Sequence, residues 1–160
     1  MFTPKQEYLQ VIKHTQLISV DLIILDDYNN VLLGLRKNEP AKNTWFVPGA
    51  RVFKDESLKE AIKRISEKEI SLPLTEDNSK IELFGVYDHT YQNNFENNDF
   101  GTRYIVFAHI IKVDREKIIL ECDDQHSDLK WFTIEDLLNN DQVHQFVKYY
   151  FAVSPENKLI

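Results

Sequence analysis

The sequence has little of what marks secreted or membrane proteins. Its 160 residues include a single cysteine, Cys122, so no disulfide can form within the chain. This absence is typical of a reducing compartment, and we expect a cytoplasmic protein. No apolar run approaches the roughly 18 residues that span a bilayer, so no membrane association is expected. The amino-terminal stretch MFTPKQEYLQ lacks the basic and then apolar order of a signal peptide.

Internal repeats and long Gly-, Ser- or Pro-rich linkers are also missing, and we expect one domain over 1–160. Positive charge is scarce, because 19 Lys and Arg face 26 Asp and Glu, for a net charge of −7. An acidic surface repels phosphate backbones, so broad nucleic-acid binding is excluded. A phosphate-bearing small molecule would need a local cluster of basic side chains or a metal ion.

The hydrophobic pattern predicts both strands and helices. The β-branched stretches LISVDLIIL and VLLGLR, separated by DDYNN, indicate a hairpin over 17–25 and 31–36. Further strands are predicted over 44–50, 81–91, 102–113 and 128–134, and helices over 4–14, 58–70 and 141–152. Because strands and helices do not strictly alternate, we expect an α/β sandwich around a mixed sheet.

Capping residues predict where the helices begin. Thr3 is expected to cap the first helix, with Gln6 completing a capping box, and Asp141 to cap the last. Ser57 and Glu60 form the clearest capping box, at the start of the helix that runs to about Ile70.

One acidic residue lies on the apolar stripe of this helix. At 100° per residue, Glu69 falls within about 20° of Leu58, among the core-facing side chains. It also lies in the last turn, where the helix dipole disfavours negative charge. Either the helix frays before Glu69, or a basic side chain pairs with it, or a metal ion does. The turn at Pro48-Gly49 favours the metal, because its backbone carbonyl is a hard oxygen of the kind Mg²⁺ prefers.

The segment GARVFKDESLKEAIKRISEKEISL resembles a degenerate Nudix box, G-x5-E-x7-R-E-U-x-E-E-x-G-U with U apolar. The positions that match are Glu56, Arg64, Glu69 and Leu72. The positions that differ are Ala50, Ile65, Ser66, Lys68 and Ser71. Glycine tolerates positive φ, so alanine at position 50 fits only if its φ is negative.

The resemblance extends beyond the box over roughly 1–152. The segments LLGLRKNEPAKNTWFVPGARVFKDE, FGVYDHTYQNNF, TRYIV and DDQHSDLKW are similar to the GDP-mannose mannosyl hydrolase branch of the Nudix superfamily. That branch also lacks the box glutamates that are replaced here by Ile65 and Lys68. The resemblance over the whole chain implies a Nudix-type α/β/α sandwich around a mixed sheet.

The branch also implies a site. It assigns metal ligation to the Gly49 carbonyl, Glu69 and Gln125, which would hold one Mg²⁺ per subunit, with Mn²⁺ able to substitute. His126, in the loop sequence DDQHSD, would be the general base, because an imidazole titrates near neutrality and neighbouring aspartates can orient it. A solvated loop histidine is the alternative. Asp21 is given a supporting catalytic role, such as orienting an arginine, or else it forms an ordinary buried ion pair.

Substrate contacts follow from the same resemblance. Arg36 and Arg51 suit bidentate phosphate binding, and Arg36 is also a catalytic candidate. Tyr104 either donates a hydrogen bond to a phosphate oxygen or is an aromatic residue of the core. His89 either contacts the sugar or the leaving group, or it has no such role.

The branch forms dimers in which the amino-terminal segment lies near the partner's site, so we expect a homodimer. Phe2 or Tyr8 would then stack on guanine. Glu56 and Arg64 are interpreted as structural supports, with Arg64 paired to Glu60 four residues earlier.

The expected activity is hydrolysis of GDP-mannose, and possibly GDP-glucose as a second substrate, to GDP and free hexose. With one metal ion and no carboxylate cluster, water would attack the anomeric carbon with inversion. The first rival is a conventional Nudix pyrophosphohydrolase that yields GMP and a sugar phosphate. The second is a nucleotide-sugar-binding module that has lost turnover.

Overall fold

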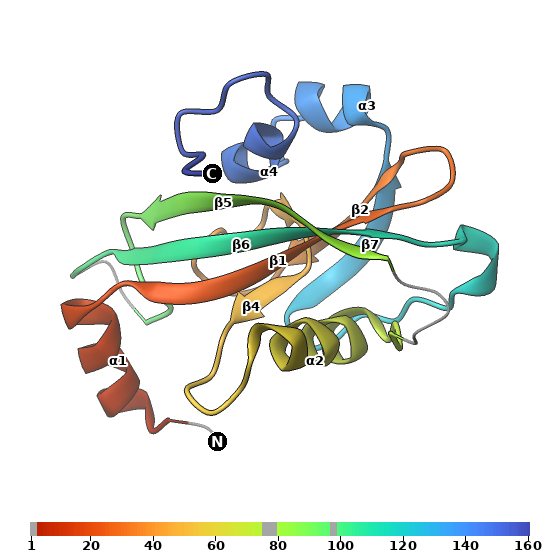
Figure 1. The fold of residues 1–160 in the computed structure, drawn as a ribbon. Coiled ribbons are helices and arrows are strands. Elements are labelled where there is room, and N and C mark those ends of the chain that lie inside the picture. Colours follow the sequence, from red (N-terminus) through yellow and green to blue (C-terminus); the bar gives the residue numbers. More distant parts are fainter. Residues whose placement is uncertain (1–2, 75–79, 97–98) are drawn as a thin grey trace.

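The computed structural model describes residues 3–74, 80–96 and 99–160. Within these ranges the chain forms a seven-stranded mixed sheet with helices on both faces (Figure 1). The strands are β1 (Leu17–Leu25), β2 (Val31–Arg36), β3 (Trp45–Phe46), β4 (Gly49–Arg51), β5 (Ile81–Tyr91), β6 (Thr102–Lys112) and β7 (His126–Phe132). The helices are α1 (Lys5–His14), α2 (Leu58–Ile70), α3 (Ile134–Asn139) and α4 (Gln145–Tyr150), with a 3₁₀ turn at Arg115–Lys117. Over the described ranges, no helix has both the length and the apolarity needed to cross a bilayer.

Strand β1 organises the sheet. It pairs in parallel with β6 along its whole length, whereas it meets the antiparallel β2 only at Leu25 and Val31. The first half of β1 instead pairs with the short strand β4, through residues 19–21. The remaining order is β3-β2-β1-β6-β5, with β7 beside β2. Because β1 and β2 pair only at one end, the turn at 47–49 lies between them in the middle of the sheet.

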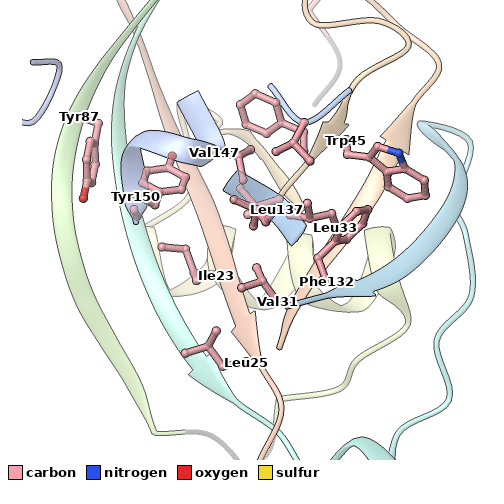
Figure 2. Packing of buried hydrophobic residues seen from close by; sticks show 14 of the residues in the cluster. Ile23, Leu25, Val31, Leu33, Trp45, Tyr87, Phe132, Leu137, Val147 and Tyr150 are labelled. Atoms are coloured by element: carbon pink, nitrogen blue, oxygen red, sulfur yellow. The ribbon is translucent and has the colours of Figure 1, made fainter. Parts of the chain in front are cut away.

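The two faces of the sheet form two cores, as the sandwich prediction requires. On β1, Val20, Leu22 and Ile24 face helix α2. Ile23 and Leu25 face the opposite core, which contains side chains from α3 and α4 (Figure 2). Because side chains alternate along a strand, Asp21 lies on the side of Ile23 and of helix α4.

Helix α2 confirms the prediction from its sequence. Ser57 and Glu60 form both halves of the capping box, and the buried stripe includes Ile65 and Glu69. Ile65 has no exposed surface, so the residue that replaces a box glutamate is a core residue. The helix ends at Ser71, whose φ of 54° and ψ of 30° are left-handed.

Two helix starts differ from prediction. Helix α1 has Pro4 at its N-cap, and among the described residues no side chain, Thr3 included, makes a capping hydrogen bond there. The last helix begins at Gln145 with His144 as its cap and ends at Tyr150, rather than running over 141–152. Val143 and His144 are extended because this segment pairs with Trp45 of β3, a long-range contact that overrides the local Asp141 signal.

Two strands also differ. The predicted strand over 44–50 is split by Val47-Pro48 into β3 and β4, which pair with different neighbours. The last strand begins at His126 and ends at Phe132, and Thr133 then caps helix α3, which the sequence analysis missed.

Backbone conformation settles the two unusual box positions. Among the described residues, positive φ at non-glycine positions occurs at Asn29, Ala41, Asn43 and Ser71. Ala50 is absent from this set, so alanine is accommodated in β4 without strain. Ser71 does occupy a conformation in which a side chain is unfavourable.

Replacing Ser71 with glycine should therefore stabilise the protein. Glycine adopts the left-handed conformation at no steric cost, and we expect the free energy of unfolding to rise by about 1 kcal/mol. Denaturant unfolding monitored by circular dichroism measures the change. Asn29→Gly is the matched control, because asparagine tolerates a φ of 60° better than serine and should gain less. An equal or larger gain at position 29 would contradict this account.

Candidate active site

A cavity of about 900 Å³ opens beside β1, β4 and β6, a size suited to a small organic ligand. Eight of the predicted site residues line it: Tyr8, Asp21, Arg36, Gly49, Arg51, His89, Tyr104 and Gln125. Glu69 and His126 lie behind the lining, the first bonded to Gly49 and the second next to Gln125 in the chain. Phe2 lies outside the described residues. The structure thus gathers side chains from most of the length of the chain.

The cavity lining is mainly positive in charge, whereas the protein as a whole is negative. Its acidic members among the described residues are Asp21 and Glu39. Its basic members are Lys5, Arg36, Lys37, Lys42, Arg51, Arg64 and Lys68. Seven cations against two acids, in a chain of net charge −7, favour a ligand with several negative charges.

The side chain of Asp21 leaves no room for a side chain at residue 49. A Cβ on Gly49 would come within 2.4 Å of Asp21 Oδ1, although the glycine has no positive φ. Burial raises the pKa of Asp21 to about 7, against the lowering effects of a hydrogen bond from Tyr150 and the charge of Arg36. The carboxylate is therefore packed directly against the turn that begins the box.

Gly49 in turn meets Glu69. In the antiparallel pairing of Asp21 with Gly49, the peptide groups of Gly49 point away from β1. The Gly49 N–H donates to Glu69 Oε2 at 2.9 Å. Glu69 is 3% exposed, and burial raises its pKa to about 8. The Gly49 hydrogen bond lowers this pKa, whereas the nearby Asp123 raises it.

These residues fit a divalent cation. The amide of Gln125 lies 3.5 Å from Glu69 Oε1, so both side chains reach the same place beside Gly49. Carboxylate, amide and backbone carbonyl oxygens are the hard ligands that Mg²⁺ prefers. Within the described ranges no group of three or more His, Cys, Asp or Glu side chains could hold a metal. The donors therefore suit one ion rather than a carboxylate-bridged cluster.

Substituting Glu69 with glutamine should abolish metal binding by removing the one charged ligand of this set. We expect the dissociation constant for Mn²⁺, followed by its electron paramagnetic resonance signal, to rise at least about a hundredfold. Glu67→Gln is the control, because Glu67 lies on the same helix but is exposed and pairs with Lys63 at 3.9 Å. A Glu69→Gln protein that binds Mn²⁺ like its parent would refute the ligand assignment.

His126 lies in a different environment from the one predicted. It is the first residue of β7 and 1% exposed, so the interpretation as a solvated loop residue is wrong. Its Nδ1 lies 2.8 Å from Asp123 Oδ1, and its ring packs so closely on Gly34 that a Cβ there would come within 2.3 Å of Cδ2. Burial lowers the pKa of His126, although Asp123 opposes this. The neutral ring thus donates from Nδ1 and keeps a lone pair on Nε2.

The Nε2 atom of His126 is buried and has no hydrogen-bond partner within the part of the chain that is described. Leaving a buried polar atom unpaired costs about 1–3 kcal/mol. An apolar side chain would avoid this cost, so the position favours a chemical role over a structural one.

Arginines and aromatic rings alternate along one wall of the cavity. Arg51 lies between the rings of Tyr8, at 4.1 Å, and Phe53, at 4.8 Å. Arg64 also packs on Phe53, at 4.1 Å, and Tyr8 stacks on Phe95 at 5.5 Å. Cation–π contacts of this kind hold the guanidinium planes in fixed orientations.

The pairing of Arg64 differs from the prediction. It bonds to Glu56, with Nε 2.9 Å from Oε2, and to the Arg51 carbonyl at 2.9 Å. Glu60 does not pair with it, because Glu60 is engaged in the capping box with Ser57. Glu56 and Arg64 therefore support the wall, as expected, but Arg64 also lines the cavity.

The remaining predicted contacts are aromatic. His89 is 2% exposed and stacks on Phe146 at 4.2 Å, and burial lowers its pKa to about 3. Tyr104 packs edge-on against Tyr91 at 6.1 Å. Burial raises the pKa of Tyr104, so its hydroxyl remains a hydrogen-bond donor.

The structure adds lining residues that the sequence analysis missed: Phe53, Lys68, Tyr91 and Phe95. The sequence ARVF, with an arginine two residues before an aromatic, held a signal for Phe53. Lys68 was noted only as a lost glutamate. Tyr8 also lines the cavity of its own chain, whereas the resemblance placed the amino-terminal segment near a partner's site.

The sandwich, and a glycine turn followed by a helix that ends in a buried glutamate, define a Nudix-type fold. The NUDIX domain family model matches residues 15–152. The low-salt glycan biosynthesis protein Agl8 of Haloferax volcanii is 36% identical over 129 residues, which cover 81% of this chain and 78% of that protein. The chain belongs to the Nudix family.

Solved structures agree with this fold. The MutT protein of Methanosarcina mazei Go1 has a TM-score of 0.66 at 20% identity, covering 85% of this chain and 90% of that one. The NUDIX domain of Shewanella oneidensis NrtR, solved with ADP ribose, has a TM-score of 0.66 at 18% identity, covering 93% and 96%. A bifunctional NMN adenylyltransferase/ADP ribose pyrophosphatase of Francisella tularensis, solved with AMP and a Mn ion, has a TM-score of 0.64 at 21% identity, covering 87% and 41%.

Proposed function

We propose that this protein is a Nudix hydrolase that cleaves a GDP-hexose, GDP-mannose or GDP-glucose, into GDP and free hexose. The observation that carries the proposal is one buried carboxylate, Glu69, bonded to Gly49 beside a cavity whose lining has more basic than acidic side chains. The similarity to a glycan biosynthesis protein supports a sugar nucleotide, as does the ADP ribose in the NrtR domain.

The cationic wall binds the diphosphate. Arg51 and Arg64 are stacked on Phe53 and present fixed guanidinium planes, which suit phosphate oxygens. Arg36 also lines the cavity, with its Nε bonded to the Pro40 carbonyl at 3.0 Å. Binding the phosphates also relieves the mutual repulsion of these cations.

Gly49, Glu69 and Gln125 would hold the divalent ion. Mg²⁺ bound there would neutralise charge on the diphosphate and make GDP a better leaving group. Ile65 is buried in the core and Lys68 is cationic, so neither supplies the further carboxylates that several ions would need.

This shortage favours water attack at the sugar's anomeric carbon with inversion. That carbon develops positive charge as the diphosphate leaves, so stabilising the leaving group lowers the barrier. His126 takes the proton from water at Nε2, and Asp123 holds its Nδ1–H. For this step the ring must become accessible from the cavity, which the adjacent Gln125 already lines.

The oxygen isotope distribution tests which bond breaks. In ¹⁸O-enriched water with Mg²⁺ and GDP-mannose, we expect the label in the hexose and none in the nucleotide. Mass spectrometry of both products makes the measurement. Label in a phosphate, together with GMP instead of GDP, would establish the rival pyrophosphohydrolase. Binding of GDP-mannose with no product under any metal would establish the binding module.

The His126→Gln variant should fold but turn over slowly. The substitution removes the hydrogen bond from Nδ1 to Asp123 and the packing on Gly34, so we expect the free energy of unfolding to fall by about 1–3 kcal/mol. Loss of the general base should lower kcat by about 10²–10⁴-fold with little change in KM. The exposed His14→Gln variant is the control for both measurements. An unchanged kcat would remove His126 from the mechanism.

A further inference from the structure

Three buried side chains from β1, β5 and α4 meet below the cavity. The Tyr150 hydroxyl donates to Asp21 Oδ2, and its oxygen lies 3.4 Å from His89 Nε2. Tyr150 is 3% exposed and belongs to the core between the sheet and helix α4 (Figure 2). The box resemblance gives this residue no role.

One hydroxyl group joins two different partners. A tyrosine oxygen carries one proton and can also accept hydrogen bonds. Its proton is directed to Asp21, so the contact with His89 requires a proton on His89 Nε2. The ring is neutral, because burial lowers its pKa, and it therefore carries one proton in total. The tautomer with Nε2–H leaves Nδ1 unprotonated.

The neighbours prevent other arrangements of these groups. Phe146 stacks on the His89 ring at 4.2 Å with an interplanar angle of 12°, which fixes the plane of the imidazole. Tyr87 packs edge-on against Tyr150 at 4.7 Å, which fixes the phenol ring. Asp21 Oδ1 lies against Gly49, so the carboxylate is held at both oxygens.

We propose that Tyr150 is a positioning residue that holds the Asp21 carboxylate against Gly49 and sets His89 in its Nε2–H tautomer. His89 lines the cavity, and its Nδ1 then accepts a hydrogen bond from a hydroxyl group of the ligand. An unprotonated nitrogen repels a phosphate oxygen, so His89 reads the sugar and not the diphosphate. This last step rests on the proposed function, whereas the tautomer does not.

The wild-type protein alone provides the first test. Long-range ¹H–¹⁵N spectra of the imidazoles, with His89 assigned from a His89→Gln sample, distinguish the two tautomers and the protonated ring. We expect a single Nε2–H form above about pH 8, where Asp21, with a pKa of about 7, is ionised and accepts the hydrogen bond from Tyr150. A ring protonated on Nδ1, or on both nitrogens, would overturn the proposal without any variant of Tyr150.

Tyr150→Phe is the second test, with Tyr87→Phe as its matched control. Both remove a hydroxyl from a buried tyrosine of the same cluster, but only Tyr150 bonds to Asp21 and His89. In Tyr150→Phe we expect mixed His89 tautomers and a kcat about 10–100-fold lower, with KM within about twofold. In Tyr87→Phe the His89 tautomer and the kcat should both match those of the parent.

The outcomes separate the two proposals. Tyr150→Phe with the parental tautomer and kcat would overturn the positioning role. A tautomer that changes as expected, in a protein that does not hydrolyse GDP-mannose, would support the positioning role and reject the proposed activity. Equal losses in both variants would reduce Tyr150 to core packing.

Discussion

Burial of Glu69 at the end of a helix is the interaction on which the site depends. A carboxylate in that place opposes the helix dipole and loses its water, and one N–H from Gly49 compensates only in part. Asp21 and Asp123 add negative charge nearby, which raises the pKa of Glu69 further. The arrangement is costly for the protein alone, and a bound divalent cation would offset that cost.

The same site imposes its geometry on the sheet. Strand β1 pairs with β2 only at Leu25 and Val31. Its residues 19–21 pair with β4, which brings Gly49 opposite Asp21. A side chain at residue 49 would collide with the carboxylate, so glycine is required there by packing. Ala50, one residue later, sits in an ordinary strand conformation. The box therefore lacks some of its carboxylates but keeps the backbone conformation that places the turn at Gly49 next to helix α2.

Charge is divided between the surface and the cavity. An acidic exterior discourages nucleic acid, whereas the clustered arginines and lysines of the lining attract a small polyanion. Stacking on Tyr8 and Phe53 keeps Arg51 rigid, which lowers the entropy lost on binding phosphate. His89, Tyr91 and Tyr104 add neutral hydrogen-bonding groups to the same lining.

Local pattern in the sequence was enough to determine helix α2, strand β5 and the inward direction of Glu69, because periodicity and caps act over a few residues. The family resemblance as a whole also named eight residues that line the cavity. Only the tertiary structure decided which distant groups meet. Tyr150 reaches Asp21 across 129 positions, Arg64 chooses Glu56 over Glu60, and His126 is buried by Gly34. Such contacts depend on strand pairing and layer packing, which local spacing does not encode.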